Sequence, residues 1–137
     1  MSQNQTLVPT VQGIYAAFGR GDVPAIIETL ADDVIWEYGG SDPGVPWLVP
    51  RRGRTGVAAF FESLAALEFQ RFEPKVIVQH ERLVIALVDI DATVKATGKP
   101  IHEEDEVHLW HFDERGRVSK FRHRVDTALH AQAAFSR

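Results

Sequence analysis

Apolar residues recur every three to four positions in three stretches of the N-terminal half, the spacing of a helix that buries one face. The first stretch runs from Leu7 to Phe18 and ends at glycines, which accept the left-handed backbone of a helix C-cap. A second helix follows Asp22, whose side chain suits a helix N-cap. A third opens at Gly53 or Thr55, and its apolar positions continue in register from Val57 to Leu67. The pattern therefore predicts three amphipathic helices.

Alternation with a period of two marks the strands. A first strand covers residues 34–38 and is expected to end at Gly39-Gly40. After residue 69 the alternation returns in four segments, near 72–79, 82–96, 103–112 and 117–125, and Asp126 or Thr127 caps a last short helix. Helices early and antiparallel strands late predict an α+β domain. A curved antiparallel or mixed sheet wrapped around the three helices leaves a conical interior, a common place for a ligand.

The strand near residues 103–112 carries the most unusual surface. Alternate side chains of a strand point to opposite faces. One face then holds two carboxylates, an imidazole and two aromatic rings: Glu104, Glu106, His108, Trp110 and Phe112. The other face holds Glu103, Asp105, Val107, Leu109 and His111. The first face is suited to the wall of a ligand cavity.

Composition narrows the class of protein. The 137 residues indicate a single domain, and a net charge of −4 argues against nucleic-acid binding. Cysteine is absent, which excludes disulfides and thiolate metal sites. No basic and apolar leader is visible, and no apolar run approaches the ~20 residues of a membrane span. We expect a soluble cytoplasmic protein without a membrane partner.

The segment from residue 40 to residue 54 is rich in proline and glycine, and loops this long often form lids or binding segments. Trp47, Leu48 and Val49 lie near its centre. Such apolar side chains are costly to leave in water. They are expected to fold over a ligand mouth, with Trp47 in a lid, or against a second subunit.

Three stretches resemble SnoaL-like polyketide cyclases and ketosteroid isomerase-related proteins. They are ADDVIWEYGG at 31–40, GRTGVAAFFESL at 53–64 and VHLWHFDERGRVSKFRHRVDTA at 107–128. The resemblance implies a nuclear-transport-factor-two-like cone and a single SnoaL-like domain over residues 1–137. This fold hosts isomerases, cyclases, dehydratases and non-catalytic modules, so the fold alone does not fix the reaction.

The resemblance also implies site residues. At the position of His108 the isomerases carry a neutral aspartate and the cyclases frequently a histidine. Tyr38 stands where the isomerases have a basic aspartate, and His123 stands near the acidic residue of the cyclases. Tyr15 corresponds to the tyrosine of the isomerases' first helix. Since both isomerase carboxylates are replaced, the resemblance argues against ordinary steroid isomerisation.

Glu106 shares its predicted face with His108. Burial raises the pKa of a carboxyl group, while an imidazole titrates near neutrality, so such a pair can divide acid and base duties. We predict His108 as the principal acid/base, Glu106 or His123 as its partner, and Tyr38 or Tyr15 as a donor to developing oxyanion charge. The alternative is a buried Glu–His pair whose two side chains only hydrogen-bond to each other and take no part in catalysis. The expected ligand-binding residues are Tyr15, Phe18, Trp36, Trp47, Phe61, Trp110 and Phe121.

Acidic stretches at residues 89–91 and 103–106 raise the question of a metal site. Because side chains alternate along a strand, Glu103 is expected on the opposite face of the sheet from Glu104, which argues against their binding the same metal ion. Glu103 and Asp105 are instead expected to pair across strands with Arg122 and Arg124. No metal and no other cofactor is predicted.

Together these observations predict an enzyme that performs cofactor-independent acid/base chemistry, as a cyclase, isomerase or dehydratase does, on a small apolar organic molecule. Two alternatives use the same fold: a non-catalytic binding module, and a dimeric scaffold whose cavity is filled by tryptophans. Apolar residues on the outer sheet face, Val107, Leu109 and Leu87, indicate a partner surface. The resemblance implies a homodimer packed sheet to sheet, unless the C-terminal helix covers these residues.

Overall fold

The computed structural model describes residues 6–38 and 44–135. Gly39 and Gly40, the predicted end of the first strand, lie outside them. The first half contains α1 (Val8–Gly19), α2 (Val23–Ile27), β1 (Leu30–Glu37), the 3₁₀ turn η1 (Pro46–Leu48), β2 (Arg51–Arg52) and α3 (Gly53–Ser63). The second half contains η2 (Leu64–Ala66), β3 (Leu67–His80), β4 (Leu83–Val94), β5 (Pro100–Phe112), β6 (Val118–Arg124) and α4 (Thr127–Ala134).

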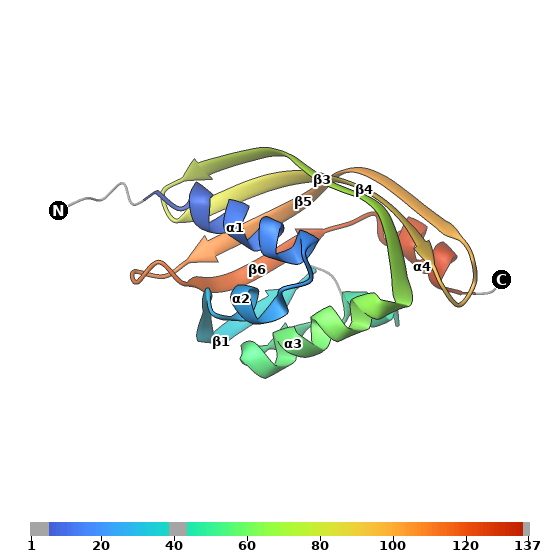
Figure 1. The fold of residues 1–137 in the computed structure, drawn as a ribbon, viewed down its shortest axis with the longest axis horizontal. Helices are drawn as coiled ribbons and strands as arrows, with labels where there is room; N and C mark the ends of the chain where they lie inside the picture. Colours follow the sequence, from blue (N-terminus) through green and yellow to red (C-terminus); the bar gives the residue numbers. More distant parts are fainter. Residues whose placement is uncertain (1–5, 39–43, 136–137) are drawn as a thin grey trace.

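The strands form one six-stranded sheet in the order β2-β1-β6-β5-β4-β3. Only β1 and β6 pair in parallel among these strands, and the other pairs are antiparallel. The long strands β3, β4 and β5 arch over α1, α2 and α3 (Figure 1). The predicted α+β fold, with a curved mixed sheet around three helices, is confirmed. No helix in the described ranges is long and apolar enough to cross a membrane.

Capping residues set where the short helices begin. The side chain of Asp22 accepts a hydrogen bond of 3.2 Å from the backbone N–H of Ala25 in α2. Asp126 does the same for α4, accepting from the backbone N–H of Leu129 at 3.1 Å. Both caps agree with the sequence-based prediction, because a carboxylate satisfies an N–H that the helix itself leaves unpaired.

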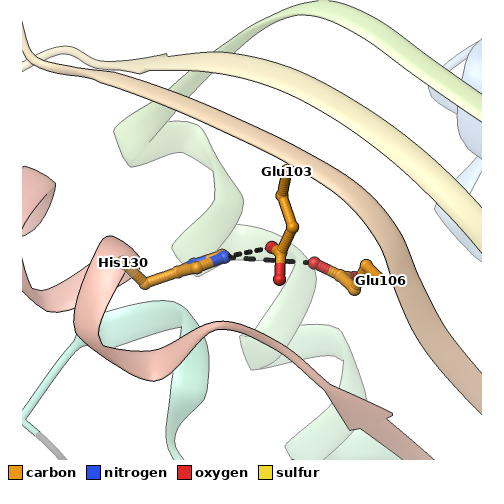
Figure 2. A group of neighbouring side chains, drawn as sticks. All are labelled: Glu103, Glu106 and His130. Carbon is orange, nitrogen blue, oxygen red and sulfur yellow. Dashed lines mark hydrogen bonds and ion pairs between the residues drawn. The ribbon is translucent and has the colours of Figure 1, made fainter.

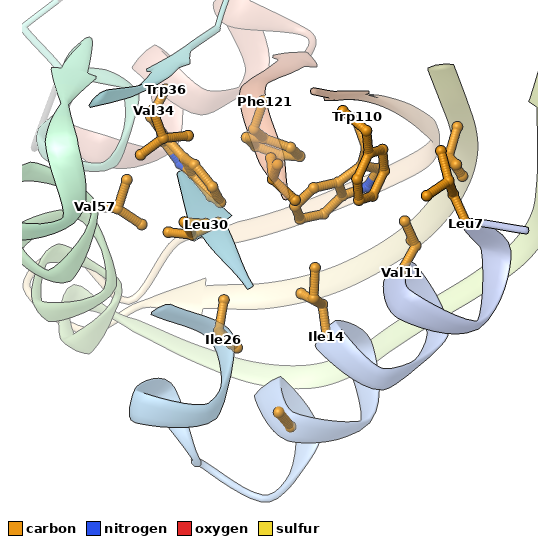
Figure 3. Packing of buried hydrophobic residues seen from close by; sticks show 14 of the residues in the cluster. Leu7, Val11, Ile14, Ile26, Leu30, Val34, Trp36, Val57, Trp110 and Phe121 are labelled. Carbon is orange, nitrogen blue, oxygen red and sulfur yellow. The ribbon is translucent and has the colours of Figure 1, made fainter. Parts of the chain in front are cut away.

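The main hydrophobic core lies between the helices and the inner face of β1, β5 and β6 (Figure 3). Three aromatic rings meet across neighbouring strands. The ring centroid of Phe121 lies 4.2 Å from that of Trp36 and 4.3 Å from that of Trp110. The helices supply Val11, Ile14, Ala17 and Ile26 to the same cluster. This part of the interior is therefore filled by side chains.

A second cluster closes the other end of the sheet, where η1 and α4 meet. Its buried members are Tyr38, Val45, Trp47, Leu48, Leu67, Val94, Ile101 and Ala133. The helix α4 thus packs on the cavity side of the sheet. In the described part of the chain it belongs to this inner cluster and does not cover Val107 and Leu109, which are half-buried on the outer face.

Strand β5 departs from simple alternation at Asp105. This residue has a φ of 63°, and the pairing with β4 shifts in register between Val88↔Glu106 and Ile90↔Glu103. Two residues of β5, Glu104 and Asp105, therefore oppose the single residue Asp89 of β4, which is a β-bulge. As a result Glu103 is buried and Glu104 is exposed, so the prediction that Glu104 shares the inner face with Glu106 was wrong.

Contacts from neighbouring strands hold the bulge. The backbone N–H of Asp105 donates to Oδ1 of Asp89 at 3.0 Å, and the Asp105 carboxylate lies 2.7 Å from the ammonium of Lys75. Arg122 pairs with Glu37, its Nε lying 2.9 Å from a carboxylate oxygen. The predicted pairs of Glu103 and Asp105 with Arg122 and Arg124 were therefore wrong, because the bulge turns Glu103 inward and Asp105 toward β3.

Candidate active site

A cavity of about 80 Å³ opens between the helices and the inner face of the sheet. Most of its wall is apolar and aromatic. The polar groups in the wall are Tyr15, Glu106, His108, His123 and His130. An apolar pocket with a few convergent polar groups is the usual form of a small-molecule site.

His108 is held at both ring nitrogens. Its Nε2 lies 2.6 Å from Oε2 of Glu106, and its Nδ1 lies 2.6 Å from the hydroxyl oxygen of Tyr15. The indole N–H of Trp110 donates to the same hydroxyl oxygen at 3.1 Å. Three side chains from β5 and one from α1 thus form a continuous hydrogen-bonded chain, Trp110–Tyr15–His108–Glu106.

Burial sets the charge of these groups. Desolvation lowers the pKa of His108 to about 3, so the imidazole is neutral at pH 7. Desolvation raises the pKa of the Tyr15 hydroxyl, and the phenol keeps its proton. The imidazole and the phenol at the centre of the chain are therefore both neutral.

A second hydrogen-bonded group surrounds Glu103 (Figure 2). The indole N–H of Trp47 donates to Nδ1 of His130 at 2.9 Å. Since an indole nitrogen can only donate, Nδ1 carries no proton, and the ring proton of His130 must be on Nε2. That Nε2 lies 2.7 Å from Oε1 of Glu103, and the backbone N–H of Asp126 donates to Oε2 of Glu103 at 2.6 Å. Each oxygen of Glu103 therefore accepts a hydrogen bond.

The two buried glutamates differ in pKa. Burial alone would raise the pKa of Glu103, but hydrogen bonds from His130 and from the Asp126 N–H outweigh it, and the pKa lies below its usual value. Burial, and then the negative charge of Glu103, raises the pKa of Glu106 well above its usual value. A proton held by the two glutamates therefore resides on Glu106 in preference to Glu103.

Glu103, Glu106 and His130 each offer a possible metal-ligand atom, and these atoms lie within 4.8 Å of one another. The bulge creates this cluster, so the argument from alternation against a shared ion does not hold at Glu103. The hydrogen bond from Trp47 is the stronger objection, because it leaves the proton on Nε2 of His130, the atom that would bind the ion. A metal at this position would require Trp47 to give up that bond.

His123 on β6 differs from the other cavity histidines. Within residues 6–38 and 44–135, its ring makes no hydrogen bond. Desolvation lowers the pKa of His123 to about 3. Its ring lies 6.4 Å from that of His108 and 6.5 Å from that of Tyr38, centroid to centroid. His123 is a neutral base that is available to a ligand.

The structure brings most of the predicted site residues to one cavity. Those in its wall are Tyr15, Phe18, Trp36, Trp47, Phe61, Glu106, His108, Phe121 and His123. Tyr38 and Trp110 stand behind the wall, Tyr38 against His123 and Trp110 hydrogen-bonded to Tyr15.

Sequence reasoning missed Glu103 and His130. The cap at Asp126 predicted the helix that carries His130, and His130 follows the cap by four residues. The surrounding alanines gave no sign of which helix face turns inward. Glu103 was assigned to the outer face because the bulge was not foreseen.

Comparisons with known proteins place this site in a family context. A family model described as a SnoaL-like domain matches residues 11–121. The chain is similar to an NTF2-like protein of unknown function from Burkholderia pseudomallei, with 26% identity, coverage of 98% of both chains and a TM-score of 0.81. Comparison with curated proteins gives no match.

Two solved structures with bound organic molecules share the fold. TerC, co-crystallised with polyporic acid, is 18% identical over 97% of this chain and 98% of its own, with a TM-score of 0.77. A Mycobacterium tuberculosis protein in complex with estradiol-17β-hemisuccinate is 16% identical over 90% of this chain and 95% of its own, with a TM-score of 0.67. At sequence identities of 16% and 18%, the similarity shows only that the fold is shared.

Proposed function

The chain belongs to the SnoaL-like domain family, and from that premise we propose that its cavity binds a small apolar organic molecule and performs cofactor-independent acid/base chemistry on it. The observation that carries the proposal is the chain Trp110–Tyr15–His108–Glu106, which ends in the wall of an apolar cavity. The solved structures of this fold that hold organic molecules support the ligand class.

His108 is the centre of the proposed proton relay. When a ligand oxygen accepts from the Tyr15 hydroxyl, Nδ1–H of His108 donates to the Tyr15 oxygen and the Glu106 acid donates to Nε2. As negative charge develops on the ligand oxygen, three protons shift one step along this chain. The ligand gains a proton and Glu106 becomes ionised, while Tyr15 ends protonated as before and His108 ends neutral with its proton on Nε2 instead of Nδ1. Proton transfer by positioned groups contributes typically ~10²–10⁴-fold to rate.

His123 is proposed as the base that takes a proton from the ligand, because its ring nitrogens have no partner in the described chain. A proton leaves a ligand carbon for His123 while another reaches the ligand oxygen from Tyr15. The imidazolium formed on His123 balances the carboxylate formed on Glu106. Tyr38, whose ring contacts that of His123 edge to face, orients the base.

The size of the cavity indicates what it accepts. An engineered protein cavity of about 150 Å³ holds benzene, and the cavity here measures about 80 Å³. The cavity is thus about half that size, so even a compact monocyclic ketone requires its wall to adjust. A larger polycyclic ligand requires a wall residue to move, and Trp47, on the η1 turn, is the proposed lid.

Exchange of carbon-bound hydrogen tests the proposal without knowledge of the natural substrate. Cyclopentanone is incubated with the protein in deuterium oxide, and the loss of its α-proton signals is followed by NMR. We expect exchange faster than in buffer, and a loss of at least tenfold in His108→Gln and in His123→Phe. The control is His111→Gln, which alters a half-buried histidine on the outer face of the same strand.

The result also separates the alternative function. Both ring nitrogens of His108 already have hydrogen-bond partners within the protein. This observation favours a non-catalytic binding module as the alternative function, which applies if no exchange occurs. Polyporic acid or estradiol-17β-hemisuccinate binding in calorimetry, together with exchange no faster than in buffer, would refute the enzyme and leave a binding protein.

We further propose a homodimer packed through the outer sheet face, in the cytoplasm. The half-buried residues Leu87, Val107 and Leu109 share that face beside charged neighbours. Light scattering is expected to give twice the monomer mass for the wild type and the monomer mass for Leu109→Arg. A monomeric wild type would refute the dimer.

A further inference from the structure

The β-bulge of β5 brings two glutamates that are three positions apart to the same buried corner. Glu103 is 7% exposed and Glu106 is 5% exposed. Their carboxylate oxygens lie within 4.8 Å of each other and of Nε2 of His130. Without the left-handed residue Asp105, the alternation of the strand would point one of them outward.

Hydrogen-bond donors decide which glutamate is ionised. His130 and the backbone N–H of Asp126 each donate a hydrogen bond to a different oxygen of Glu103, at 2.7 Å and 2.6 Å. The His130 ring is neutral because Trp47 donates to its other nitrogen. Glu103 is therefore a carboxylate stabilised by two donors, with no cation beside it.

No positive charge faces Glu106 from the described elements packed around it. Its neighbours are Glu103 and His108 on its own strand and His130 on α4, at 4.0 Å, while β6 and α1 contribute His123 and Tyr15 to the wall of the same cavity. The paired residue on β4 is the apolar Val88. A second carboxylate beside Glu103 would be repelled without compensation, so Glu106 retains a proton.

We propose that Glu103 is a positioning residue: it forms with Glu106 a carboxyl pair that holds one proton, and the donors on Glu103 keep that proton on Glu106. The inference rests on the proposed function, in which Glu106 supplies the proton that reaches the ligand oxygen. Once Glu106 has given up this proton, two carboxylates face each other. Their repulsion favours the return of the proton and resets the relay.

The pair is also connected to the cavity wall. Trp47 lines the cavity and fixes the His130 ring through its indole N–H. Displacement of Trp47 by a large ligand frees Nδ1 of His130, which can then bind a proton. A cation on His130 would stabilise an ionised Glu106 and so make Glu106 a stronger acid when the ligand is in place.

Infrared difference spectroscopy of the ligand-free protein tests the pair, because the carbonyl stretch of a protonated carboxyl group is resolved from that of a carboxylate. At pH 7 the wild type is expected to show one buried protonated carboxyl, which Glu106→Gln removes. In Glu103→Gln the pH at which this band disappears falls by about one to two units, a ten- to hundred-fold lower proton affinity. Glu104→Gln, which changes the exposed neighbour, leaves the band unchanged.

Two results would overturn the proposal: no protonated carboxyl at pH 7 in the wild type, or a band in Glu103→Gln that titrates as in the wild type. If Glu103→Gln does not fold, Trp47→Phe serves instead. It keeps a ring but removes the donor, so the band of Glu106 should disappear at lower pH than in the wild type, and an unchanged band would refute the pair. Because the measurement needs no ligand, it is independent of the ketone exchange assay. The carboxyl pair can be refuted while ketone exchange is still observed, and ketone exchange can be absent while the carboxyl pair is present.

Discussion

The pH dependence of folding stability follows from three buried groups of the cavity. His108 and His123 both have a pKa of about 3 in the folded protein, against an ordinary 6.5, because burial disfavours their charged forms. The unfolded chain therefore binds more protons than the folded chain between pH 6.5 and pH 3. The stability these histidines contribute is present above pH 6.5 and is lost as the pH falls.

Glu106 acts in the opposite direction. Burial, and then the charge of Glu103, raises its folded pKa well above the ordinary 4.5, so the folded chain holds a proton that the unfolded chain has released. The stability that Glu106 contributes is present below pH 4.5 and is lost as the pH rises toward the folded pKa. One proton of difference corresponds to about 1.4 kcal/mol for each pH unit.

These opposing effects make the Glu106→Gln variant informative. From pH 7 to pH 5 each histidine costs the wild type about 2 kcal/mol of the free energy of unfolding, about 4 kcal/mol for both, and Glu106 offsets part of this loss. Glu106→Gln removes this offset, so the free energy of unfolding of the variant is expected to fall by the full amount, about 4 kcal/mol, over the same pH range. Above pH 7 the wild type loses about 1.4 kcal/mol per pH unit relative to the variant while Glu106 keeps its proton.

Urea denaturation followed by circular dichroism, at pH values from 5 to 9, measures these slopes. Glu104→Gln is the control, because that side chain is exposed and should follow the wild-type curve. Parallel stability curves for the wild type and Glu106→Gln over the whole range would show that Glu106 is ionised in the folded protein. The reasoning about the cavity would then be wrong.

Three further substitutions test individual contacts, each by urea denaturation. Tyr15→Phe leaves the donor of Trp110 and one nitrogen of His108 without a buried partner, and should cost about 1–3 kcal/mol; no loss would mean that water replaces the hydroxyl. Glu81→Gly relieves a φ of 53° in an exposed turn and should stabilise the protein by about 0.5–1 kcal/mol, whereas destabilisation would contradict strain there. Asp22→Ala removes the cap of α2 and should cost about 1 kcal/mol, and an unchanged stability would show that the cap is dispensable.

Periodicity predicted the fold because each element has a buried face of regular spacing. On β5 the alternation correctly turned His108, Trp110 and Phe112 inward. It failed at Glu103, because the bulge at Asp105 depends on contacts with other strands. No local pattern in the sequence shows that Asp89 will accept the Asp105 N–H.

Within the candidate site, the position of His130 could not be predicted from the sequence. His130 lies on a short helix with alanine on several sides, so its orientation is fixed by tertiary contacts with Trp47 and Glu103. Trp47 itself was visible as an aromatic residue in a loop rich in proline and glycine. Its burial agrees with the prediction that the loop folds over the interior, but its partner could not be read from the sequence.

The chain has three tryptophans, and all of them are at most 3% exposed. Trp36 and Trp47 line the cavity, while Trp110 donates to the tyrosine at the end of the relay. Their fluorescence is therefore an internal reporter of this one region. A molecule that enters changes the polarity around two indole rings, so emission wavelength and quenching allow unlabelled compound collections to be screened against the native protein.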